Sequence, residues 1–138
     1  MRSSIVALVV CLFAGTALTA LSQQPAATQW TGVWQGKLDG LPSVTLTLAD
    51  DTGRLDGTLV LNLIEKPHGG EAHVFAIDPH TLVNPHIANG TLEFRVVKKG
   101  NSGGLMGFTV APLPDGNLQI HCVDCGSDAP TVEMARMM

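Results

Sequence analysis

The stretch WTGVWQG, Trp30–Gly36, decides the fold of this chain, because it opens the first of a series of short alternating segments. From Trp34 onward, Trp34 and Leu38 fall on one side, and the polar residues Gln35 and Lys37 fall on the other. An alternation with a period of two residues is typical of a strand that buries one face. We therefore predict that a β-sheet begins here.

The same alternation recurs along the rest of the chain. No window of helical periodicity interrupts it, and 15 Gly and 8 Pro residues separate the segments. The further predicted strands are Val44–Leu48, Leu55–Leu63, His73–Asp78, Leu92–Val96, Leu105–Ala111, Leu118–His121 and Thr131–Arg136, with a further short strand between Thr81 and Ile87. Short strands joined by tight turns favour antiparallel pairing. We predict an all-β fold, a small antiparallel up-and-down β-barrel of about eight strands, with a β-sandwich as the alternative.

Two ends of the chain carry a resemblance to a known group of proteins. Gly32-Val33-Trp34 near the N-terminus and Arg136 in the last predicted strand together resemble the calycin group, which includes lipocalins and avidins. The resemblance implies that Trp34 and Arg136 are a barrel-closing pair, with the guanidinium across the indole ring in a cation–π contact. It does not extend to biotin binding, because avidins line their pocket with several Trp residues and this chain has 2 Trp and no Tyr.

The N-terminus has the order of a secretory signal peptide. Arg2 precedes an apolar run from Ile5 to Ala14, and small residues follow up to Ser22. The run is shorter than the ~20 residues that a membrane-spanning helix needs. We predict a signal peptide over residues 1–22, a flexible lead over 23–29 and a single calycin-like barrel domain over 30–138. The mature protein is then secreted or periplasmic, with no membrane span.

The charge of the chain argues against some partners. The full chain has a net charge of −4, and removal of the leader with Arg2 makes it more acidic. Nucleic-acid binding needs a positive surface, so we expect no nucleic-acid partner.

The inward positions of the predicted strands define a candidate cavity. A closed eight-strand barrel has room for packed side chains or for one small ligand. Glycines at inward positions are expected to leave volume unfilled. The predicted cavity lining is Gly36, Leu46, Leu59, Phe75, Phe94, Gly107 and Met134.

Cys122 and Cys125 form a Cys-x-x-Cys motif and are the only cysteines after the predicted leader. In an exported protein such a pair tends to oxidise, so we expect a structural disulfide. A redox pair and a zinc site with the neighbouring His121 remain alternatives. We predict no metal ion and no cofactor.

These features favour a binding protein over an enzyme. We find no nucleophile elbow and no other catalytic constellation, so an enzyme ranks last. The leading hypothesis is an exported barrel that holds a small hydrophobic ligand. The alternative is a protein-interaction module, such as a protease inhibitor with a protein partner.

Overall fold

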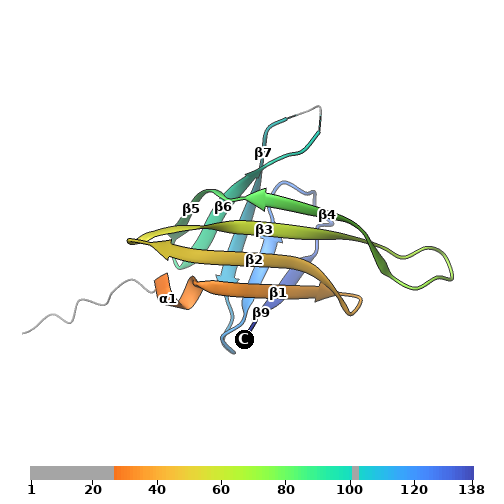
Figure 1. Ribbon diagram of the computed structural model, residues 1–138, viewed down its shortest axis with the longest axis horizontal. Coiled ribbons are helices and arrows are strands. Elements are labelled where there is room, and N and C mark those ends of the chain that lie inside the picture. Colours follow the sequence, from red (N-terminus) through yellow and green to blue (C-terminus); the bar gives the residue numbers. More distant parts are fainter. Residues whose placement is uncertain (1–26, 101–102) are drawn as a thin grey trace, which may run out of the picture.

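The computed structural model describes residues 27–100 and 103–138, which form one antiparallel sheet of nine strands (Figure 1). A single helical turn, α1 (Ala27–Trp30), precedes the sheet. The strands are β1 (Gly32–Leu38), β2 (Leu41–Asp51), β3 (Arg54–Glu65), β4 (His73–Thr81), β5 (Val83–Ala88), β6 (Thr91–Val97), β7 (Leu105–Pro112), β8 (Leu118–Cys122) and β9 (Thr131–Arg136).

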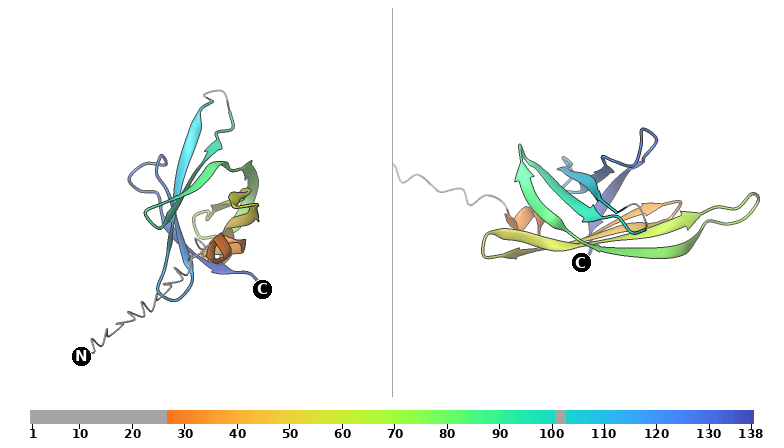
Figure 2. Two further views of the ribbon diagram at one scale, coloured as in Figure 1. Left: turned by 90° about the vertical axis from the view of Figure 1, so that its left-hand side faces the viewer. Right: turned by 90° about the horizontal axis from the view of Figure 1, so that it is seen from above.

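The first and last strands are neighbours in the middle of this sheet. The strand order is β4-β3-β2-β1-β9-β8-β7-β6-β5, so the two free edges, β4 and β5, are consecutive in the chain. Figure 2 shows that the sheet curls strongly into a half-barrel. The predicted all-β, barrel-like fold is confirmed, including the short strand before β6. The sandwich alternative is wrong, because all the strands belong to one continuous sheet.

A tight turn and an edge position allow the short strand β5 to pair with β6 despite its proline. β5 and β6 are joined by Asn89 and Gly90, which have positive φ values of 52° and 76°. Two successive residues with positive φ match the type I′ turn, whose twist suits a β-hairpin. Pro85 lies where the β5–β6 register shifts between Val83 and His86. A proline is tolerated there because β5 is an edge strand.

The core fills the concave face of the curled sheet. Phe94 and Phe108 stack there with ring centroids 5.5 Å apart. The largest side chains with almost no exposed surface are Trp34, Leu46, Leu59, Leu92, Met134, Val96 and Val110. Because they come from strands on both sides of β1 and β9, the whole sheet shares one core.

The buried face of strand β4 is the one that was predicted to be exposed. Asp78 and His80 lie opposite core residues of β3, whereas Phe75 is 56% exposed and Ile77 is 67% exposed. The prediction that Phe75 faces the interior is therefore wrong. Val74–Ile77 is apolar at every position, so its alternation does not identify the buried face, and pairing with β3 decides it.

Candidate functional site

Trp30, Trp34 and Arg136 form a cluster where β1 pairs with β9. Trp34 and Arg136 are direct cross-strand partners, and Arg136 Cζ lies 4.3 Å from the centroid of the Trp34 ring. The predicted contact between these two residues is therefore present. Trp34 donates its Nε1 hydrogen to the backbone oxygen of Trp30 at 2.8 Å, and both tryptophans are 2% exposed. The indole is thus buried with its one polar atom satisfied.

Backbone oxygens of the N-terminal segment accept hydrogen bonds from the Arg136 guanidinium. The guanidinium donates hydrogen bonds to the backbone oxygens of Gln29, at 2.9 Å, and Thr31. Gly32 has a φ of 124°, and a Cβ there would lie 2.5 Å from Arg136 Nη1. Gly32 is therefore needed both for its backbone conformation and for the space that the guanidinium occupies.

The middle of the interior is packed with side chains. Leu46, Leu59 and Met134 are fully buried, and Phe94 is 2% exposed. Gly36 leaves no free volume either, because a Cβ there would lie within 3 Å of the Val132 and Val44 side chains. These predicted cavity residues therefore form the solid centre of the core.

Gly107 lies on the face opposite to the predicted one. Its neighbours on β7, Phe108 and Met106, pack into the core, and the Gly107 backbone nitrogen donates to Asp124 Oδ2 at 2.7 Å. A Cβ on Gly107 would lie 3.2 Å from that oxygen. The prediction that Gly107 faces the interior is wrong, because both faces of β7 are apolar and alternation does not distinguish them.

A partly open apolar pocket of about 200 Å³ lies at the opposite end of β1 from Trp34. Strands from both sides of the curled sheet contribute to it. Its lining is Leu38, Ser43, Val44, Leu61, Asn62, Leu63, Phe108, Ile120, Cys122, Cys125, Ala129, Pro130 and Val132. Sequence alternation identified many of these residues as inward, but it did not show how far along each strand the packed core ends.

The polar side chains of Ser43 and Asn62 in the pocket form hydrogen bonds with backbone oxygens of the protein. The Ser43 hydroxyl donates to the backbone oxygen of Gly36 at 3.3 Å, and Asn62 Nδ2 donates to the backbone oxygen of Pro42 at 3.0 Å. Satisfied groups of this kind place no strong demand on a ligand. The pocket is thus suited chemically to an apolar group.

Cys122 and Cys125 lie at the rim of this pocket as a disulfide-bonded pair, with Cα atoms 5.5 Å apart. Cys122 is buried at the end of β8, whereas Cys125 is exposed. The pair therefore closes a small loop beside the pocket mouth.

A larger and more polar hollow of about 520 Å³ lies across β5, β6 and β7. It contains an exposed ion pair, in which His86 Nε2 lies 3.3 Å from Glu93 Oε2. Arg95 and Asp124 also line it. Its mixed charges do not favour the apolar ligand that the sequence predicted.

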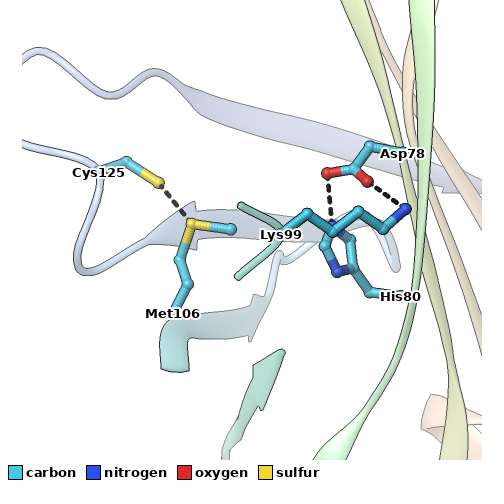
Figure 3. A network of polar contacts seen from close by, with 5 residues as sticks. All are labelled: Asp78, His80, Lys99, Met106 and Cys125. Carbon is cyan, nitrogen blue, oxygen red and sulfur yellow. Dashed lines mark hydrogen bonds and ion pairs between the residues drawn. The ribbon is translucent and has the colours of Figure 1, made fainter. Parts of the chain in front are cut away.

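A buried histidine belongs to a polar cluster at the edge strand β4. Figure 3 shows the Asp78 carboxylate between His80 and Lys99, and its oxygens lie 2.7 Å from His80 Nε2 and 2.5 Å from Lys99 Nζ. The His80 side chain is only 3% exposed. The hydrogen bond from Lys99 holds the pKa of Asp78 below its ordinary value, and the His80 contact acts in the same direction against the opposing effect of burial. The cluster joins β4 to the segment after β6, where no strand ladder connects them.

We expect Asp78→Asn to destabilise the protein at neutral pH by about 1–2 kcal/mol, because it removes a charge-assisted contact to Lys99. A carboxyl whose pKa is lowered by folding stabilises the native state above its unfolded pKa, and that stabilisation disappears as the pH falls through the folded pKa. The difference between wild type and Asp78→Asn should therefore shrink below about pH 4. Urea unfolding at pH 7 and pH 3 measures it.

The exposed pair of Glu65 and His73, with side chains more than half exposed, provides a control. Glu65→Gln should change stability by less than about 0.5 kcal/mol. Equal effects of the two substitutions at pH 7 would contradict a stabilising role for the cluster.

Within residues 27–100 and 103–138, no group of three or more His, Cys, Asp or Glu side chains is arranged to hold a metal ion. The same residues contain no helix long and apolar enough to span a membrane. The predicted signal peptide, residues 1–22, and residues 23–26 of the predicted lead lie outside the described residues. Residues 27–29 of that lead belong to α1.

Comparison with known proteins identifies no relative. No family model, curated protein or solved structure matches the chain.

Proposed function

We propose that the mature domain is an exported β-barrel that binds a small hydrophobic molecule in the apolar pocket away from Trp34. The observation that carries this proposal is the lining of that pocket, which is mostly aliphatic and aromatic, with Ser43 and Asn62 hydrogen-bonded to the backbone. Removing apolar surface from water is the driving force for such binding. Export rests on the N-terminal leader alone.

The size of the pocket limits the ligand. Pockets for drug-sized molecules typically have volumes of about 300–1,000 Å³, and this one has about 200 Å³. A ligand with one or two aromatic rings, or a short alkyl chain, fits this volume better than a long lipid. Leu38 and Leu63 line the pocket and are 37% and 41% exposed, so we expect the ligand to enter beside them.

We expect naphthalene to bind the mature protein and to shift the backbone NMR signals of Leu61, Ile120 and Val132. Ala129→Trp should weaken this binding by at least about tenfold, because the indole would occupy the pocket. Heteronuclear NMR titration measures both the location and the affinity.

Ala49→Trp is the matched control, because Ala49 is exposed on β2 and does not line the pocket. This variant should bind naphthalene like the wild type. Shifts scattered over the surface, or equal weakening by both substitutions, would contradict the proposed site.

Protein binding is the second candidate function, and the edge strand β4 favours it. Phe75 and Ile77 are more than half exposed on a strand that has a ladder partner on one side only. A free edge with exposed apolar side chains can accept an added strand from a partner. Failure of naphthalene and of short alkanols to bind would favour this second function.

A further inference from the structure

Three sulfur atoms come together at the rim of the pocket, and two of them belong to cysteines that line it. The Met106 thioether sulfur lies 3.5 Å from Cys125 Sγ (Figure 3). Cys125 is bonded to Cys122. Because the disulfide leaves Cys125 without a thiol hydrogen, this is a contact between two sulfurs rather than a hydrogen bond. The three sulfurs come from β7, from the end of β8 and from the turn that follows.

Backbone contacts hold this turn against β7. Cys122 is the ladder partner of Phe108, two residues beyond Met106. In the next residues, the Val123 nitrogen donates to the Gly107 oxygen at 2.9 Å, and the Gly107 nitrogen donates to Asp124 Oδ2 at 2.7 Å. In addition to the disulfide, these hydrogen bonds hold the residues just before Cys125 against β7, beside Met106.

The ligand set distinguishes between metals. Thiolates and thioethers are soft ligands, which suit Cu(I), zinc and iron–sulfur clusters. A structural zinc site needs four ligands, usually from Cys, His and carboxylates. The described residues contain no group of three or more His, Cys, Asp or Glu side chains that could supply them. We propose that Cys122, Cys125 and Met106, once the disulfide is reduced, form a three-sulfur site for Cu(I).

The chemistry of loading the site has two steps. A dithiol reductant transfers two electrons and two protons to the Cys122–Cys125 disulfide, giving two thiols, and is itself oxidised to a disulfide. Cu(I) then binds the two sulfurs as thiolates and releases their two protons, while the thioether binds as a neutral ligand. The copper stays Cu(I) throughout, and the oxidised protein has no thiolate to offer.

For the test, the mature protein is reduced with a phosphine under anaerobic conditions, and the phosphine is then removed. The protein then competes with bathocuproine disulfonate for Cu(I). Reduced wild type should bind one Cu(I) per chain, and the oxidised protein should bind none. Loss of an outer-shell partner costs a metal site about 10- to 100-fold in affinity. Met106→Leu removes a ligand, so it should weaken binding by at least about tenfold. X-ray absorption should detect three sulfur ligands in wild type and two in this variant.

Met137→Leu is the matched control, because Met137 is half exposed beyond β9 and does not line the pocket to which the cysteines belong. It should bind Cu(I) like the wild type. Circular dichroism of the reduced proteins establishes that each is folded. Unchanged affinity in Met106→Leu, binding by the oxidised protein, or no stoichiometric binding by reduced wild type would overturn the proposal.

Discussion

Trp34→Ala is expected to lower the free energy of unfolding by about 3–5 kcal/mol, the usual cost of truncating a large buried aromatic residue. Trp34 is 2% exposed, packs in the shared core, and is hydrogen-bonded to Trp30. The substitution also removes the surface on which Arg136 lies. Chemical unfolding followed by circular dichroism measures the loss.

Arg136→Ala alone should cost about 1–3 kcal/mol, because the cation–π contact is lost together with two hydrogen bonds to backbone oxygens. The double variant Trp34→Ala/Arg136→Ala should lose less than the sum of the single effects, since both residues contribute to one interaction. Arg54→Ala, in the exposed start of β3, is the charge-matched control and should have little effect. Strict additivity would show that the contact between Trp34 and Arg136 contributes nothing to stability.

Gly57→Ala is expected to destabilise the protein by about 3 kcal/mol, at the upper end of the usual cost of overpacking. A Cβ at Gly57 would lie 2.0 Å from the backbone oxygen of Thr47, which belongs to the neighbouring strand β2. Backbone cannot move away as a flexible side chain can, so β2 and β3 would have to separate. Thermal and urea unfolding of the purified variant measure the effect.

Whether Gly57→Ala lowers or raises stability distinguishes a close contact between β2 and β3 from the ordinary effect of replacing a glycine. Gly57 has no positive φ, and replacing such a glycine by alanine ordinarily stabilises a protein by about 0.4–1 kcal/mol through the unfolded state. Gly107→Ala is the matched control on β7, because its Cβ would meet side-chain atoms rather than backbone, Asp124 Oδ2 at 3.2 Å and Val123 Cβ at 3.9 Å. It should stay within about 0.5 kcal/mol of wild type. Stabilisation by Gly57→Ala would mean that the two strands are not held as closely as described.

The interior has two parts with different roles. Around Leu46, Leu59 and Met134 the side chains are fully buried and fill the space between the strands. Beyond Val44 and Val132 the packing ends and the pocket begins. A ligand there would extend the core rather than fill its centre, so substitutions in the centre should act on stability and substitutions at the pocket on binding.

The sequence by itself determined the strands, their turns and the contact between the two ends of the chain. Where a polar residue regularly follows an apolar one, as in Val44–Leu48 and Leu92–Val96, burial of one face identifies the strand and its inner side. Asn89-Gly90 predicts a turn, because Asn and Gly are among the few residues that adopt positive φ easily. The pairing of Trp34 with Arg136 came from the resemblance of Gly32-Val33-Trp34 and Arg136 to the calycin group, and the contact is present.

Only the tertiary structure decided which side of β4 and β7 is buried and where the cavity lies. Phe75 and Gly107 lie in segments with apolar residues on both faces, so pairing with neighbouring strands, rather than local periodicity, selects the inner face. Gly36 was expected to leave space, but Val132 and Val44 from adjacent strands fill it. The contact between Met106 and Cys125 likewise depends on the register of β7 against β8. Each of these features depends on which residues from distant parts of the chain pack beside a given position. The local sequence does not encode those neighbours.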